Sequence, residues 1–272
     1  METMVVDGLT LFFDAQEREA AGLVRDACEK SIRLIRECWG LDTPADCRVY
    51  VMTSWLHFVF HSAPWPWRIL LGISMPLWYY RVKKTWPFAG GWAQRYGKRR
   101  AVGIKPPRLI QQADRAMGEL IFVQEADISE KVQHVTCHEL THAFAGHLGL
   151  PMWLNEGLAM VTVDRFAGKP TVRHRTLDIL GRWSGKASPG RYRDVSPKDR
   201  DALVYHAVRG YWITRYVGET QPGLLKGLLS RRQSHRALED EVAAALGMDH
   251  AGFWENIDSI VVSYFEQKEG GQ

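Results

Sequence analysis

The first half of the chain alternates between short runs with a strand pattern and one long run with a helix pattern. Apolar residues fill or alternate through residues 9–14 (LTLFFD) and 48–53 (RVYVMT), as in strands that turn one face to a core. Between them, residues 15–39 repeat apolar positions at helical spacing and end at Gly40, which predicts an amphipathic helix. This half is therefore expected to hold a sheet with one long helix.

The next segment has no clear period. Trp, Pro and Gly are frequent from 55 to 101, so this segment is predicted to be irregular, with a Trp-rich insertion at about 55–87. Residues 90–110 are expected to form a hairpin that contains a strand at 101–104.

Helical spacing dominates the second half. Apolar residues recur at that spacing from a capping Ser129 as far as Gly146, where a helix is predicted to stop. Further helices are predicted at residues 155–163, from a capping Ser196 to Gly218, and at 224–265 with a break near Gly247.

The order of these elements predicts an α+β fold in one domain, residues 1–272. Residues 1–128 would form a mixed β-sheet with the long helix and the Trp-rich insertion. Residues 129–272 would form a mainly helical half.

Composition excludes several classes of protein. With 272 residues and 46% hydrophobic residues, the chain can bury a sizeable core and is neither disordered nor fibrous. The formal charge of +4 is mildly basic, and the basic clusters are scattered, so nucleic-acid binding is not expected. Four cysteines without a CxxC pair and an N-terminus without a secretory signal favour a cytoplasmic location. The sequence indicates no oligomeric state.

One apolar stretch, residues 65–82, leaves two interpretations open. Its apolar run is shorter than the roughly 20 residues that a membrane-spanning helix needs. Aromatic packing over an irregular insertion is the favoured interpretation, because short apolar runs are commonest in cores. The alternative is a peripheral contact with a membrane, which the Trp and Tyr residues and the flanking Arg and Lys would suit.

The strongest chemical signal is an HExxH motif, His138-Glu139-Leu140-Thr141-His142, inside the helix that begins at Ser129. Histidines at positions i and i+4 lie on one helix face, so their imidazoles can bind one Zn²⁺ ion. Glu139 would lie beside the metal, where it can take a proton from metal-bound water. The motif thus supplies the metal ligands and the general base of a hydrolase.

A catalytic zinc site usually has a third protein ligand. His134 continues the histidine stripe, but eight residues of helix separate it from His142 by about 12 Å. Glu156 is the better candidate, because Gly149 and Pro151 turn the chain and the helix after them can bring its acid back towards the histidines.

HExxH followed by Trp153-Leu-Asn-Glu-Gly-Leu-Ala resembles the gluzincin metallopeptidases, specifically short peptidase-like domains with the pattern HExxH and then WLxEGLA. The resemblance implies a zincin-like helical half, Glu156 as third zinc ligand and peptide or protein substrates. It also implies a Tyr or His over the metal as oxyanion donor, for which Tyr205 and then His206 are the candidates, with Tyr211 a weaker alternative. Tyr205 could instead belong to an apolar helix face.

The chain departs from the family pattern in two places. Many gluzincins have an acid four positions after the glutamate ligand that orients a histidine, whereas this chain has Met160; Asp164 or Asn155 could substitute for it. The insertion at 55–87 is also unlike the family. The leading hypothesis is a zinc metallopeptidase, and the alternative is a non-catalytic zinc-binding module whose aromatic insertion binds a partner or membrane surface. Glu139 favours the enzyme, because structural zinc needs no general base.

Overall fold

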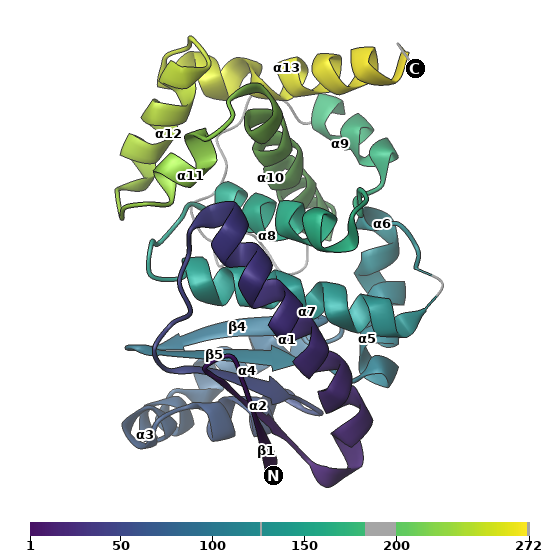
Figure 1. Ribbon diagram of the computed structural model, residues 1–272, viewed down its shortest axis with the longest axis vertical. Coiled ribbons are helices and arrows are strands. Elements are labelled where there is room, and N and C mark those ends of the chain that lie inside the picture. The colour runs from purple at the N-terminus through teal and green to yellow at the C-terminus, as the bar shows by residue number, and fades with distance from the viewer. Residues whose placement is uncertain (126, 183–199, 271–272) are drawn as a thin grey trace.

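A computed structural model describes residues 1–125, 127–182 and 200–270 and shows an α+β fold (Figure 1). Its sheet is mixed, with the strand order β1-β2-β3-β5-β4. The inner pairs β2–β3 and β3–β5 are parallel, and the outer pairs β1–β2 and β4–β5 are antiparallel. The strands are β1 (Glu2–Val6), β2 (Leu9–Phe13), β3 (Cys47–Val51), β4 (Gly91–Tyr96) and β5 (Arg99–Ile104).

The strands predicted at 9–14, 48–53 and 101–104 are confirmed within two residues. The hairpin expected within 90–110 is also confirmed, but it ends at Ile104, and residues 107–110 belong to a helix. Strand β1 was not predicted. It is joined to β2 by Asp7 and Gly8, whose φ angles of 43° and 85° are both positive. A two-residue Asp-Gly turn with this backbone is typical of a tight hairpin, so the sequence did carry the signal.

One face of the sheet is covered by α1 (Arg18–Trp39) and α7 (Ile128–Ala145). Alternate strand residues such as Val49, Val51 and Val102 point into the largest apolar cluster, which also contains residues of these two helices. Helix α1 ends as predicted at Gly40, whose φ of 69° is left-handed.

The other face of the sheet is covered by three helices, and the prediction of an irregular segment was wrong here. They are α2 (Trp55–Ser62), α3 (Trp65–Ile73) and α4 (Met75–Thr85). Ser54 caps α2 by accepting a hydrogen bond from the backbone N–H of His57. Pro66 and Pro76 occupy the first turns of α3 and α4, where proline favours helix initiation. The prolines that suggested irregularity therefore start helices.

Most of the remaining helices stack beyond α1 and α7, with α8 and then α10 above them and α13 at the far end, whereas α5 and α6 lie beside one end of α7 (Figure 1). Helix α7 is capped by Asp127 rather than Ser129, α8 begins three residues earlier than predicted, and a break at Gly247 separates α12 from α13. The predicted cap at Ser196 lies outside the described residues. The helices not named so far are α5 (Pro107–Ala113), α6 (Glu119–Ile121), α8 (Met152–Ala167), α9 (Leu177–Arg182), α10 (Arg200–Thr220), α11 (Leu224–Leu228), α12 (His235–Ala245) and α13 (His250–Gly270). A π-helical turn lies at Asp114–Gly118, and short 3₁₀ turns lie at Ala15–Glu17 and His174–Thr176.

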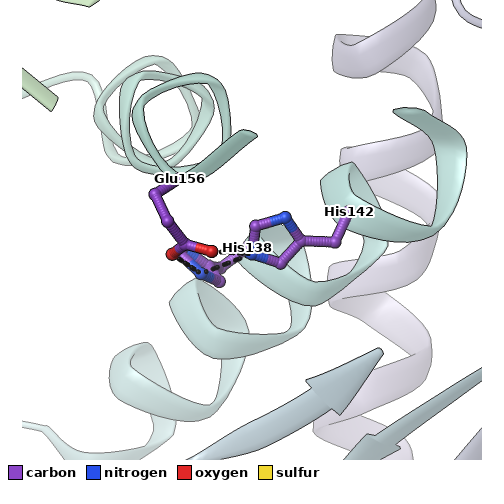
Figure 2. Close-up of side chains that lie close together, drawn as sticks. All are labelled: His138, His142 and Glu156. Carbon is purple, nitrogen blue, oxygen red and sulfur yellow. Dashed lines mark hydrogen bonds and ion pairs between the residues drawn. The ribbon is translucent and has the colours of Figure 1, made fainter. Parts of the chain in front are cut away.

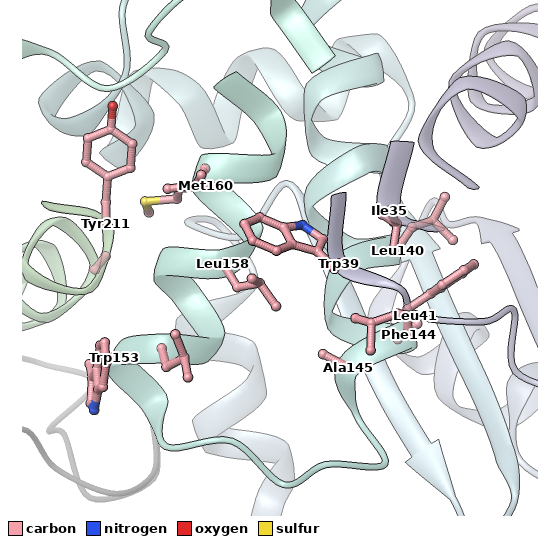
Figure 3. Packing of buried hydrophobic residues seen from close by; sticks show 14 of the residues in the cluster. Ile35, Trp39, Leu41, Leu140, Phe144, Ala145, Trp153, Leu158, Met160 and Tyr211 are labelled. Carbon is pink, nitrogen blue, oxygen red and sulfur yellow. The ribbon is translucent and has the colours of Figure 1, made fainter. Parts of the chain in front are cut away.

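The apolar core runs without interruption from the sheet into the helical half. Figure 3 shows Ile35 and Trp39 of α1 beside Leu140 and Phe144 of α7, with Leu158 of α8 next to them. Across the described part of the chain, every helix is too short or too polar to traverse a bilayer.

Candidate metal centre

Helix α7 places the two histidines of the HExxH motif side by side. Asp127 accepts a hydrogen bond from the backbone N–H of Ser129 at 2.8 Å, which fixes the start of the helix. The Nε2 atoms of His138 and His142 lie 3.0 Å apart, one helical turn from each other. Their imidazoles therefore converge on one point, as the spacing predicts.

Helix α8 brings Glu156 to the same point (Figure 2). One carboxylate oxygen lies 3.5 Å from Nε2 of His138, and the other lies 3.3 Å from Nε2 of His142. The three side chains each offer a ligand atom, and these atoms lie within 4.8 Å of one another. This structure confirms the predicted grouping of His138, His142 and Glu156 as a potential metal site.

The spacing of the donors fits a tetrahedral ion. Zinc bonds of about 2.0–2.2 Å to imidazole nitrogen and carboxylate oxygen require ligand atoms about 3.3–3.5 Å apart on a tetrahedron. The two imidazole nitrogens are 3.0 Å apart, and each imidazole is 3.3–3.5 Å from the nearer oxygen of Glu156, so the donor set is compact enough to surround one such ion. Two nitrogens and one carboxylate suit Zn²⁺ and other first-row divalent ions, so the geometry alone does not fix which metal is held.

The position of Glu156 depends on close packing between α8 and α10. A Cβ atom on Gly157 would run into the backbone of Gly210 and the side chain of Thr214. A Cβ on Gly210 would run into the backbone of Trp153 in the same way. Only glycine fits at both positions, so the two helices touch backbone to backbone and α8 is held in place.

The other residues of the WLNEGLA segment are core residues. Trp153, Leu154 and Leu158 are fully buried, and the Trp153 indole packs against Phe253 and Trp254 of α13. Glu156 is thus the polar member of an otherwise apolar helix face, with a side chain that is 7% exposed. A cation held between this buried carboxylate and the two imidazoles would compensate the charge of the carboxylate.

Glu139 lies beside the donors in an apolar environment. Burial raises the pKa of Glu139 to about 7 in the metal-free protein, with the Glu156 carboxylate adding to the rise and His142 opposing it. Strand β4 presses on it, because a Cβ on Gly91 would overlap the Glu139 side chain. A carboxyl group with a pKa near 7 can accept and return a proton at neutral pH.

The donors and Glu139 line one cavity of about 680 Å³. Strand β4 contributes residues from Gly91 to Arg95 along one wall, and α4 contributes Arg81, Val82 and Thr85. Gly91 and its strand were not among the predicted site residues. The signal was the pair Gly90-Gly91 at the start of a strand, where glycine often marks the close approach of another group.

The residues that support the histidines differ from those expected. Met160 lines the cavity at the position where the family pattern has an acid. Asp164 does not orient a histidine: its carboxylate accepts hydrogen bonds from Thr171 and from the Tyr211 hydroxyl. Asn155 lines the cavity, but Nδ1 of His142 is buried without a hydrogen-bond partner among the described residues.

Tyr205 and His206 are not among the described residues that line the cavity. The Tyr205 hydroxyl donates to Asp258 of α13 at 3.3 Å, beside a buried Arg209–Asp258 ion pair. From α10 the described residues that line the cavity are Leu203 and Ala207. The positions of Tyr205 and Tyr211 are those of buried helix-packing residues, which was the alternative interpretation of this face.

His134 lies in the cavity wall but apart from the metal ligands. Its Nδ1 is 3.9 Å from the carboxylate of Glu125, and its side chain is 12% exposed.

Comparisons of the chain with family models, with curated proteins and with solved structures give no match.

Proposed function

We propose that this protein is a zinc-dependent peptidase of the gluzincin type. His138, His142 and Glu156 hold the ion, and Glu139 is the general base. Zinc bound there supplies an acidified water, because it lowers the pKa of a bound water from about 15.7 to about 7. Glu139, next to the ligands in the same cavity, would accept the proton that this water loses and would return it to the leaving amine.

The observation that carries this proposal is the combination of the donor set with Glu139 in a single cavity. Three donors grouped within 4.8 Å could equally hold a structural ion. A structural ion, however, has no use for a buried, unpaired carboxylate next to it or for a cavity of about 680 Å³. Both features support catalysis over the alternative of a non-catalytic zinc module.

The cavity wall favours an extended peptide as substrate. Strand β4 is at the edge of the sheet, paired with β5 alone among the described strands, and it runs along the cavity. The open edge of a strand offers backbone donors and acceptors to a peptide that lies beside it as an added strand. Such binding would place a peptide bond close to Glu139, because Gly91 of the strand lies directly against the Glu139 side chain.

We also propose that the protein works in a reducing compartment such as the cytoplasm. Cys28, Cys38, Cys47 and Cys137 are all free thiols, and all except Cys38 are buried. Free buried thiols are typical of proteins kept away from oxidising conditions.

Substitution of Glu139 by Gln tests the proposal. The variant keeps all three ligands, so it is expected to bind one zinc per chain as wild type does. Hydrolysis of a peptide library is expected to fall about 10²–10⁴-fold, because the proton acceptor is lost. Zinc is measured by elemental analysis and cleavage by mass spectrometry.

Matched controls separate this effect from general damage. Glu130→Gln changes an exposed carboxylate in the first turn of the same helix and should leave zinc content and cleavage unchanged. His138→Ala should lose zinc, whereas His147→Ala, beyond the end of the helix, should not. Full cleavage by the Glu139→Gln variant would contradict the proposed mechanism, and zinc-free wild-type protein would remove the metal centre.

A further inference from the structure

The α3–α4 hairpin (Trp65–Thr85) has the most exposed apolar surface in the described part of the chain. Among all the described residues, fourteen large hydrophobic side chains are exposed. Ten of these fourteen lie between Leu56 and Tyr80. No residue of α3 is buried, and Val82 is the one buried residue of α4. Ile73 and Leu77, at the tip, are 77% and 87% exposed. Helix α3 lies at the outer edge of the molecule, at lower left in Figure 1.

The exposed residues surround the hairpin instead of forming one stripe. Ile69 and Leu70 are adjacent and both exposed, as are Tyr79 and Tyr80. Neighbouring residues of a helix point about 100° apart, so each helix shows apolar side chains on more than one side. A groove on a protein partner covers a single stripe of a helix, whereas the interfacial layer of a bilayer surrounds whatever enters it.

The distribution of charged residues indicates which lipid charge this surface would favour. The segment 47–113 contains no Asp or Glu, yet it contains eleven of the 35 Lys and Arg residues of the chain. All 31 acidic residues lie elsewhere, where they outnumber the remaining 24 basic residues. Four of the eleven cations are in the hairpin itself, Arg68, Arg81, Lys83 and Lys84. This arrangement is complementary to an anionic lipid surface and repels a cationic one.

The aromatic residues have the composition of a membrane interface. The hairpin carries Trp65, Trp67, Trp78, Tyr79 and Tyr80. Trp and Tyr concentrate at the level of lipid headgroups because each has an apolar ring and a polar atom. The long side chains of Lys83 and Lys84 can lie along such rings with their charge in water, as Lys84 does over the Tyr80 ring at 4.2 Å.

We propose that the α3–α4 hairpin is a docking surface for an anionic phospholipid bilayer, which it enters to interfacial depth without crossing. Helix α4 also connects this surface to the cavity: Leu77 is exposed, and Arg81, about 6 Å further along the helix, lines the cavity wall. Docking therefore holds the cavity close to the headgroup layer. Resting on the proposed function, this favours substrates that are peptide segments at the membrane surface.

Vesicle binding tests the docking surface. The probes are phosphatidylcholine vesicles with and without phosphatidylserine, and binding is measured by co-sedimentation. Wild-type protein is expected to bind the anionic vesicles at least about tenfold more tightly, and added salt should weaken that binding. The assay measures binding alone, so its outcome is independent of whether the metal centre hydrolyses peptides.

Variants at the tip identify the surface. Ile73→Asp combined with Leu77→Asp should weaken binding at least about tenfold, because two charges would enter the apolar layer. Both positions are exposed, so unfolding temperature should not change. Val5→Asp is the matched control: Val5 is 80% exposed on strand β1, outside the acid-free segment, and its variant should bind as wild type does.

Charge is tested separately. Lys83→Gln and Lys84→Gln should each weaken binding to anionic vesicles about fivefold, whereas Lys226→Gln on α11 should have no effect. Equal binding to both kinds of vesicle, or equal loss in the Val5→Asp control, would overturn the proposal. So would a wild-type dimer in sedimentation velocity that the tip variants abolish, because a second copy of the chain would then cover the hairpin.

Discussion

The metal centre and the α3–α4 hairpin contrast in how their positions are fixed. Around the metal centre, α7 and α8 are buried on most sides, and even backbone atoms of α8 and α10 touch. The Trp39 indole of α1 donates to Thr162 of α8 at 2.8 Å and adds a buried polar link. The hairpin, in contrast, contributes a single buried residue, Val82, which is still 9% exposed. A site that must hold donors at bonding distance requires the first kind of support.

This contrast indicates what each region does. Rigid packing holds His138, His142 and Glu156 together before any ion arrives, so binding a metal costs little ordering. Apolar side chains stabilise a fold when they are buried in its core. The exposed apolar side chains of the hairpin remain in water, so they contribute no such stabilisation. That surface is useful only if something outside the chain covers it.

The largest expected difference in stability between the two regions comes from substituting one leucine in each. Leu158 of α8 is fully buried and Leu77 of α4 is 87% exposed. We expect Leu158→Ala to lower the free energy of unfolding by about 2–5 kcal/mol, through lost burial and the cavity left behind. Leu77→Ala should change it by less than about 0.5 kcal/mol. Urea unfolding measures both, and a comparable loss from Leu77→Ala would show that the hairpin is part of the fold's core.

Two glycines give a smaller effect and concern the site directly. Gly157→Ala should cost about 1–3 kcal/mol of unfolding free energy, because its Cβ would push α8 away from α10. The same shift moves the neighbouring Glu156, so zinc affinity should fall as well.

Gly72→Ala in α3 is the matched substitution in the hairpin. A Cβ there meets no heavy atom within 4 Å, so alanine should stabilise the helix by up to about 1 kcal/mol. Isothermal titration with zinc and urea unfolding distinguish the two variants. Unchanged zinc affinity in Gly157→Ala would mean that Glu156 does not depend on the α8–α10 contact.

The sequence predicted the parts of the site that depend on local spacing. His138 and His142 converge because four residues make about one helical turn, and this holds in any fold. Glu156 could be inferred because a short turn returns the chain next to the first helix. The close contact of Gly157 with Gly210 could not be read, because the partner is 53 residues further along the chain. The direction of Tyr205 likewise depends on how α10 is rotated against its neighbours.

The same reasoning explains the errors in the fold. The strands and long helix of the first half were predicted because one side of each faces a core, which imposes a period on the sequence. The hairpin helices turn only a narrow side to the core, through Leu71, Trp78 and Val82, and carry further apolar residues on their exposed sides. These exposed apolar residues, together with Pro66 and Pro76, obscured the helical period, so the prediction of an irregular segment failed.

A titration concerns the cavity wall, and its effect on stability is confined to acidic pH. Burial is the main cause that lowers the pKa of His134 to about 4; the nearby Lys131, Lys169 and Lys30 contribute to the lowering, and Glu125 opposes it. The folded protein therefore keeps His134 neutral where the unfolded chain, with an ordinary His pKa of about 6.5, takes up a proton. Stability must then fall as pH drops from about 6.5 to about 4.

His134→Gln should remove this contribution. The difference in free energy of unfolding between variant and wild type should be constant above about pH 7 and should shift in favour of the variant below about pH 6.5. Taking the difference cancels groups that titrate in both proteins, and the hairpin adds nothing, since residues 65–85 contain no His, Asp or Glu. Urea unfolding across pH gives both curves. Parallel curves down to pH 4 would mean that His134 is open to solvent, and the wall of the cavity would then be as loosely packed as the hairpin beside it.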